Sequence, residues 1–373
     1  MQRRDGLALL LVALSARAGS AERDDAIHRG RHLRFPADHG AHPGARIEWW
    51  YLTGHLHAAG LPVDAPPRWG FQITYFRSRT GLAQTLPGRF APRQLLFAHA
   101  AVTDLGAPGQ PGRHVHDQRI ARWNGLDLTP RAHAALGDTD LSLGGWTLRR
   151  QPADGGYAAW LAADAFALDL QMQPTQPLLL QGEQGFSQKG PQPEHASHYL
   201  SQPQLAVSGR LGQGGVAPVA VQGRAWLDHE WSDSLMAPGT VGWDWVGVNL
   251  FDGSALTVFR LRGQGDAPPV WAGGSFRDAQ GRTTIFGPTD VRFEPGRRWT
   301  SPATSATYPV QWTLQTPAGP FTLNALLDAQ ELDSRASTGT VYWEGLSALA
   351  DATGRQIGLG YLEMTGYAGR LAL

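Results

Sequence analysis

The sequence contains no cysteine, which excludes disulfide bonds, thiolate metal sites and a lipid anchor on an acylated cysteine. Charge is also scarce: charged residues make up 17% of the chain, and the 32 basic and 32 acidic residues cancel to a formal net charge of zero. A neutral chain without a cluster of Lys and Arg lacks the electrostatic footprint of a nucleic-acid-binding protein. We therefore expect no nucleic-acid partner and no attraction to an anionic membrane surface.

Helical patterns and long apolar runs are missing as well. No window sustains the i, i+3, i+4 spacing of a helix over several turns. No stretch approaches the roughly 20 apolar residues that a membrane-spanning helix requires, so we expect no transmembrane segment.

The first residues resemble an export signal. Arg3 and Arg4 form a basic start, residues 6–14 form a short apolar run, and small residues at 16–21 supply cleavage sites. We predict a signal peptide at residues 1–21 and a periplasmic or secreted protein. Asp5 after the two arginines leaves the choice between the general secretory and the twin-arginine route open.

Tryptophan, glycine and proline are abundant, with 14, 46 and 26 residues. Short aromatic and β-branched runs recur between Gly, Pro and Asp along the whole chain, for example at residues 47–57 and 243–251. Roughly 20 such strands exceed one open sheet, and no propeller blade repeats at a fixed period. We predict an antiparallel all-β protein of two packed β-barrels, at residues 22–212 and 213–373, divided at the Gly-rich residues 211–215.

Two Trp-rich acidic segments hold the candidate chemistry. Residues 47–54 read Ile-Glu-Trp-Trp-Tyr-Leu-Thr-Gly, and residues 225–232 read Ala-Trp-Leu-Asp-His-Glu-Trp-Ser. A carboxyl group among aromatic rings loses hydration, so its pKa rises and it can stay protonated near neutral pH as a general acid. The negative faces of the rings can also stabilise a cationic intermediate.

Strand alternation divides the second segment between two faces. Trp226, Asp228 and Glu230 share one face, whereas His229 and Trp231 share the other. Repulsion between two neighbouring carboxylates would raise one pKa further.

The same alternation places Glu48 with Trp50 and separates it from Trp49 and Tyr51. Glu48 is a candidate second carboxylate that positions water or takes a proton back. His198 is a candidate to orient the acid or to shuttle protons near pH 7.

Four sequence blocks carry a family resemblance. They are Phe-Pro-Ala-Asp-His-Gly-Ala-His-Pro at residues 35–43 leading into 48–54, then residues 226–231, Gly-Trp-Asp-Trp at 242–245, and Gly-Tyr-Leu-Glu-Met-Thr-Gly-Tyr at 360–367. In this order they resemble the AttH and carotenoid 1,2-hydratase family (CrtC-like). The resemblance implies two lipocalin-like barrels without a metal or organic cofactor, and it covers hydratases of carotenoids and isoflavonoids, cyclases, and exported bacterial members.

A hydratase of this kind protonates an isolated alkene and lets water capture the resulting tertiary carbocation, which requires a strong, dry acid. The resemblance points to Asp228, because the hydratase members carry an essential aspartate in this block. The catalytic candidates are thus Asp228, Glu48, Glu230 and His198. The candidate ligand-binding residues are Trp49, Trp50, Tyr51, Trp226, His229, Trp231, Trp243, Asp244 and Trp245.

Several alternatives remain open at this point. An acidic residue beside Trp can simply accept hydrogen bonds at a barrel end, and pairing of Asp228 with Arg224 would favour that structural role. Glu344 and Glu363 lie in similar aromatic strands and are interpreted mainly as structural. The protein could equally be a non-catalytic carrier of an apolar ligand that serves an envelope transport system. An exported location also fits poorly with carotenoids, whose synthesis belongs to the cytoplasmic membrane.

The sequence gives little support for a metal site or for a catalytic serine nucleophile. The pairs His55 with His57 and His114 with His116 share strand faces, but neither has a third ligand at a characteristic spacing. The run Gly-Phe-Ser-Gln-Lys at residues 185–189 lacks the final glycine of a nucleophile elbow. We expect no metal and no cofactor.

Overall fold

The computed structural model describes residues 25–62, 65–82, 85, 91–123, 131–234, 236–265 and 267–369. The predicted signal peptide at residues 1–21 lies outside these ranges. Within them every regular element is a β-strand apart from η1, a single 3-10 turn at Ala37–His39. None of the described residues forms a helix with the length and apolar character needed to cross a membrane.

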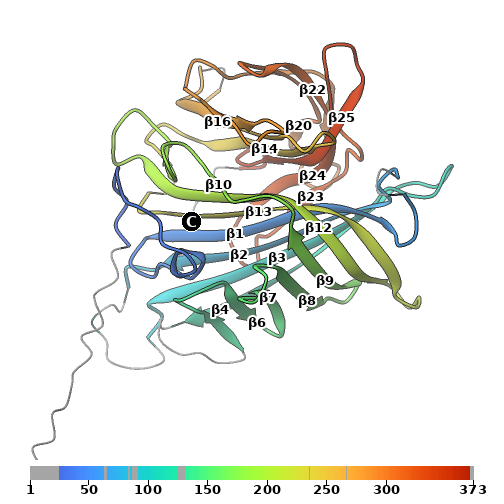
Figure 1. The fold of residues 1–373 in the computed structure, drawn as a ribbon, viewed down its shortest axis with the longest axis horizontal. Helices are drawn as coiled ribbons and strands as arrows, with labels where there is room; N and C mark the ends of the chain where they lie inside the picture. Colours follow the sequence, from blue (N-terminus) through green and yellow to red (C-terminus); the bar gives the residue numbers. More distant parts are fainter. Residues whose placement is uncertain are drawn as a thin grey trace, which may run out of the picture.

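Thirteen strands make up the first sheet, which coils into a nearly closed barrel (Figure 1). They are β1 (Ile47–Ala58), β2 (Trp69–Arg79), β3 (Gln94–Asp104), β4 (Arg113–Trp123), β5 (Ala132–Ala134), β6 (Asp140–Leu143), β7 (Trp146–Arg150), β8 (Tyr157–Ala162), β9 (Phe166–Pro174), β10 (Leu179–Leu180), β11 (Phe186–Gln188), β12 (Ala196–Gln213) and β13 (Val219–Ser232). Their order is β4-β3-β2-β1-β13-β12-β9-β8-β7-β6-β5, with β10 and β11 paired to β12. The end strands β4 and β5 approach each other, which nearly closes the barrel.

Ten strands make up the second sheet, a half-barrel. They are β14 (Gly242–Leu250), β15 (Ala255–Arg262), β16 (Trp271–Arg277), β17 (Thr283–Phe286), β18 (Arg292–Pro295), β21 (Gln311–Thr316), β22 (Gly319–Ala325), β23 (Glu331–Asp333), β24 (Val341–Ala350) and β25 (Gln356–Met364). Their order is β17-β16-β15-β14-β25-β24-β22-β21-β18, with β23 paired to β24. The short strands β19 (Arg298–Thr300) and β20 (Thr307–Pro309) pair separately.

The two sheets pack face to face, with β14 and β25 lying across β13 and β1 (Figure 1). Each sheet encloses its own apolar core, because alternate side chains of each strand turn inward. A third core of buried aromatic and aliphatic side chains joins the outer faces of the sheets. Its members are Tyr51, Leu179, Trp226, Trp245, Ala255, Phe259, Leu346 and Tyr361.

The predicted all-β fold of two packed lipocalin-like barrels is confirmed. The Gly-rich residues 211–215, at which we divided the two barrels, lie at the β12–β13 hairpin, where Gly214 and Gly215 have φ angles of 28° and 80°. The chain passes from the first sheet to the second between Ser232 and Gly242. Hairpin turns and linkers both use glycine, so composition does not distinguish them.

The pairing of β1 with β13 requires the two backbones to approach closely at Gly223, which pairs with Leu56. A Cβ atom there would lie 1.9 Å from the His55 carbonyl oxygen. We expect Gly223→Ala to lower the free energy of unfolding by about 1–3 kcal/mol, because the strands must separate. Urea denaturation measures this, with Gly137→Ala as the control because a Cβ at Gly137 meets nothing within 4 Å. Equal stability of the two variants would contradict this account of the pairing.

Candidate active site

A cavity of ≈ 120 Å³ lies between the facing sides of the two sheets. Its aromatic walls come from both sheets and include Trp49, Tyr51, Phe76, Phe97 and Tyr199 from the first and Trp243, Trp245, Phe259 and Tyr342 from the second. Carboxyl groups also line it, namely Asp228, Glu230, Glu344 and Glu363. The cavity is thus an apolar chamber with acidic groups on two opposing walls.

Strand alternation explains which side chains reach the cavity. On β1, Trp49 and Tyr51 line it, whereas Trp50 lies in the core of the first barrel. On β14, Trp243 and Trp245 line it, and Asp244 between them is held by Arg260 and Tyr367 at 2.7 and 2.9 Å.

Asp228 on β13 is buried beside the cavity and accepts three hydrogen bonds. Trp226 Nε1 donates to Oδ1 at 2.7 Å, the Ser201 hydroxyl donates to Oδ1 at 2.5 Å, and the Tyr199 hydroxyl donates to Oδ2 at 2.7 Å. Burial raises the pKa of Asp228 to about 7, although the three hydrogen bonds lower it, and the nearby Glu230 raises it further. A large share of the molecules therefore carries a proton on Asp228 at neutral pH.

Glu230 shares this wall but differs from Asp228 in having a cation beside it. Lys189 Nζ lies 3.1 Å from Glu230 Oε1, and the Ser197 hydroxyl donates to the same oxygen. The Lys189 ammonium also lies over the rings of Tyr199 and Phe259, at 4.6 and 4.1 Å from their centres. Within the described ranges no ion pair joins Asp228 to Arg224 or to any other cation. Of the two carboxyl groups, Asp228 is the one suited to hold and release a proton.

The opposing wall holds Glu344 on β24 and Glu363 on β25, which are direct cross-strand partners. Burial, followed by the charge of Glu363, raises the pKa of Glu344 well above its usual value. Burial also raises the pKa of Glu363 to about 7; a hydrogen bond from Trp243 opposes the rise, and the charge of Asp228 adds to it. These groups were interpreted mainly as structural from the sequence, yet both border the cavity.

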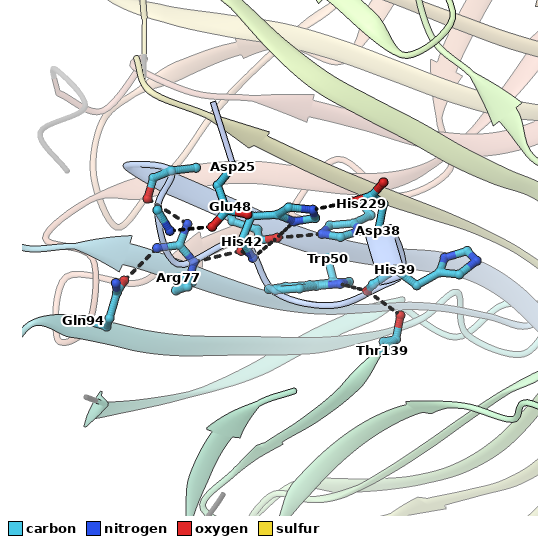
Figure 2. Close-up of polar contacts among 12 residues, drawn as sticks. Asp25, Asp38, His39, His42, Glu48, Trp50, Arg77, Gln94, Thr139 and His229 are labelled. Carbon is cyan, nitrogen blue, oxygen red and sulfur yellow. Dashed lines mark hydrogen bonds and ion pairs between the residues drawn. The ribbon is translucent and has the colours of Figure 1, made fainter. Parts of the chain in front are cut away.

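Glu48 belongs to a different cluster, inside the first barrel (Figure 2). Its carboxylate lies 2.7 Å from His42 Nδ1, 2.9 Å from His229 Nε2 and 2.8 Å from the Arg77 Nε that donates to it. His42 Nε2 in turn lies 3.1 Å from Asp38 Oδ1. Burial alone would raise the pKa of Glu48, but His42 and Arg77 outweigh it and hold this pKa well below its usual value. Glu48 is therefore a permanently ionised anchor.

The same cluster is the one set of described residues with metal-ligand spacing, because ligand atoms of His42, Glu48 and His229 lie within 4.8 Å of one another. Arg77 is bound to the same carboxylate, and its charge opposes a second cation there. The imidazole of His42 stacks on Trp231 at 3.6 Å, and that of His229 stacks on Trp50 at 4.6 Å. We interpret the cluster as a packed polar anchor rather than a metal site.

The model that describes the AttH-like family matches residues 26–367. The chain belongs to the AttH-like family. A crystal structure assigned to AttH from Nitrosomonas europaea is similar to it at 44% sequence identity and a TM-score of 0.80, covering 91% of this chain and 99% of that chain. Kievitone hydratase from Nectria haematococca is similar at 15% identity and a TM-score of 0.65, covering 91% and 94%, which shows a shared fold. A search of curated proteins found no match.

In this AttH-like protein the cavity is lined by seven of the candidate site residues. They are Asp228, Glu230, Glu48, Trp49, Tyr51, Trp243 and Trp245, and Trp226 reaches the site through its hydrogen bond to Asp228. Glu48 borders the cavity, but its carboxylate is engaged with His42, Arg77 and His229.

The remaining candidates lie away from the cavity. His198 pairs with Trp231 across β12 and β13, and their rings are 5.5 Å apart, near the stacked pair of His42 and Trp231. Trp50 and His229 stack together inside the first barrel, and Asp244 forms ion pairs within the second. These residues stabilise the barrels that carry the site.

Sequence reasoning missed Tyr199 and Lys189 and underrated Glu344 and Glu363. A usable signal exists for the glutamates, because Glu344 alternates with Tyr342 and Glu363 alternates with Tyr361. The same alternation of acid and aromatic singled out Trp226 and Asp228. Tyr199 and Lys189 have no comparable local pattern.

We expect Glu48→Gln to lower the free energy of unfolding at pH 7 by about 3–5 kcal/mol, because it leaves Arg77 buried without its carboxylate. The lowered pKa of Glu48 means that its stabilisation is present above its usual pKa of 4.5 and is lost as the pH falls below that value. The wild type should therefore lose more stability than Glu48→Gln on acidification from pH 7.

Chemical denaturation across this pH range measures both effects, and Glu294→Gln on the exposed side of β18 is the control. A Glu48→Gln variant as stable as the wild type at pH 7 would show that the cluster contributes nothing to folding.

Proposed function

We propose that this AttH-like protein adds water to, or cyclises, a small hydrophobic molecule with an electron-rich alkene, using Asp228 as the general acid. The observation that carries the proposal is the position of Asp228: a buried carboxyl group on the wall of an aromatic cavity, which forms no ion pair with the cations of the described residues. A pKa of about 7 suits a general acid that works near neutral pH.

The first chemical step is transfer of the Asp228 proton to an alkene carbon. The alkene π pair forms the new C–H bond, the O–H bond breaks, and a tertiary carbocation faces the Asp228 carboxylate. Trp49, Trp243 and Trp245 line the same cavity, and an aromatic ring that presents its face to the cation can stabilise it by about 1–2 kcal/mol when water is excluded. Water then attacks the cation and gives up one proton to a carboxylate of the cavity, which leaves a tertiary alcohol. Alternatively, a second alkene of the same molecule attacks the cation to close a ring, and the new cation loses a proton to such a carboxylate to give an alkene.

Tyr199 extends the reach of the acid. Its hydroxyl donates to Asp228 Oδ2, accepts a hydrogen bond from Trp245 Nε1 at 3.1 Å, and belongs to a residue that lines the cavity. Burial and the charge of Asp228 raise the pKa of Tyr199 well above its usual value, so the phenol stays protonated. When Asp228 carries its proton on Oδ2, the hydrogen bond to Tyr199 can reverse, and the phenol can then pass its own proton on while it takes the proton of Asp228.

The cavity volume limits what the protein can enclose. An engineered cavity of about 150 Å³ in another protein holds one benzene molecule. A volume of ≈ 120 Å³ therefore suits one isoprenyl end group rather than an entire polyene. We infer that the reacting end of the substrate enters the cavity and that the remainder extends outside it.

Support from relatives is limited to the fold. Kievitone hydratase carries hydration on a similar fold, which is consistent with this chemistry. We also propose that the protein acts outside the cytoplasm, because Arg3 and Arg4 precede a short apolar run as in an export signal.

We expect the wild type to convert an isoprenyl alkene such as geraniol into a product heavier by one water, and Asp228→Asn to do so at least about 100-fold more slowly. The rate should fall as the pH rises through about 7, because Asp228 then loses its proton. Mass spectrometry with isotope-labelled water measures the product. Asp169→Asn, on the exposed side of β9, is the matched control.

The same variant has a second expected effect. The raised pKa of Asp228 means that the folded state resists its ionisation, so stability is lost as the pH rises from its usual 3.8 through about 7. Asp228→Asn should therefore be more stable than the wild type at pH 8 by chemical denaturation. If both proteins instead retain an extracted apolar ligand without altering it, the protein is a carrier and Asp228 has no catalytic role.

A further inference from the structure

We propose that Glu344 and Glu363 form the second proton-transfer group of the cavity and accept the proton released when water captures the carbocation. This inference rests on the proposed function and extends it to the acidic groups on the opposite wall of the cavity. It gives a role to two acidic groups that the acid step from Asp228 does not use.

The geometry of the pair carries the inference. Glu344 and Glu363 are direct partners on the adjacent antiparallel strands β24 and β25, and both line the cavity. Directly opposed residues have Cβ atoms about 4.5–5.5 Å apart, so two glutamate carboxyl groups can meet and share one proton. Two like charges this close in a buried site do not both ionise, so the pair carries at most one carboxylate at a time, and that carboxylate is the form that can accept a proton.

Trp243 donates a hydrogen bond to Glu363, but among the described residues no positive charge is paired with either glutamate. Within the described ranges no ion pair involves Glu344 or Glu363, and Glu344 Oε1 is buried without a hydrogen-bond partner. Tyr51 lowers the pKa of Glu344 slightly, although its hydroxyl forms no well-aligned hydrogen bond with it. A buried carboxyl group without a cation costs folding free energy, and such groups concentrate at functional sites.

Other elements packed against the pair contribute acids and phenols. These neighbouring titratable groups are Tyr51 on β1, Asp228 and Glu230 on β13, Asp244 on β14, Tyr342 on β24 and Tyr361 on β25. Burial and the negative charges among these groups keep the pair from losing both protons, so a singly ionised pair is the form that acts as the base.

The placement of the pair matches the needs of hydration. Asp228 belongs to the first sheet and the glutamate pair to the second, so a substrate in the cavity lies between an acid and a base. When the water oxygen forms its C–O bond to the cation, one O–H bond breaks and the proton passes to the carboxylate of the pair. That proton later returns to bulk water, and Asp228 regains one from the same source, so the enzyme ends unchanged.

An experiment in deuterium oxide distinguishes the group that accepts the proton from the group that donates it. With geraniol as the probe, reversible protonation by Asp228 exchanges deuterium into the alkene, and water capture yields the hydrated product. Without an acceptor the cation returns its proton to Asp228. We therefore expect Glu344→Gln and Glu363→Gln to hydrate about 10-fold more slowly or worse while deuterium exchange continues. Asp228→Asn should lose both reactions.

Glu331→Gln is the matched control, because Glu331 lies beside β24 on β23 but is held by Ser301, Thr304 and Tyr308 outside the cavity. If the Glu344 and Glu363 variants lose exchange and hydration equally, or lose neither reaction, the acceptor role is overturned but acid catalysis by Asp228 is not. Wild-type protein that neither hydrates nor exchanges the probe would overturn acid catalysis by Asp228 itself, and the acceptor role with it.

A second measurement needs no substrate. NMR titration of isotope-labelled glutamate carboxyl carbons in the wild type should show two groups that titrate in separate steps above the usual value of 4.5. Glu344→Gln should lower the pKa of Glu363, because it removes a neighbouring negative charge. Two carboxyl groups that titrate together near 4.5 would show that the glutamates do not share a proton, and would overturn the inference.

Discussion

The rest of the structure depends on the packing of one sheet against the outer face of the other. A barrel wall normally presents one side to its own core and the other to water, but β1 and β13 are covered on both sides. This double burial removes water from Asp228 and its neighbours, and it lets the second sheet add acidic groups to the same space. Neither sheet alone would form a cavity between opposed carboxyl groups.

Two acidic side chains on neighbouring strands show how environment sets chemistry. Glu48 on β1 and Asp228 on β13 are both buried and both lie among tryptophans. Glu48 faces Arg77 and two histidines, which hold its pKa low, whereas Asp228 faces hydroxyl groups and an indole, and burial raises its pKa to about 7. The charged cluster holds the start of β1 in place, whereas Asp228, which is hydrogen-bonded but forms no ion pair with the described cations, is available for proton transfer.

Much of this organisation could be predicted. Runs of aromatic residues between glycine and proline predicted strands, and alternation correctly separated Trp226, Asp228 and Glu230 from His229 and Trp231. The failures have a common cause. Alternation shows which residues share a face of a strand but not what covers that face. Glu48 and His198 were therefore grouped with Asp228, although Arg77 binds the Glu48 carboxylate and Trp231 packs against the His198 ring.

The sequence by itself determined the strand content, the two-barrel fold, the family and the pairing of acids with aromatic rings, because these follow from local patterns of period two and from four conserved-looking blocks read in order. Only the tertiary structure decided that Asp228 lines the same cavity as Glu344 and Glu363, which lie more than a hundred positions later in the chain. The physical reason is that a pKa and a cavity depend on burial and on neighbours across a sheet interface. Those are properties of packing between distant segments, and no local pattern records them.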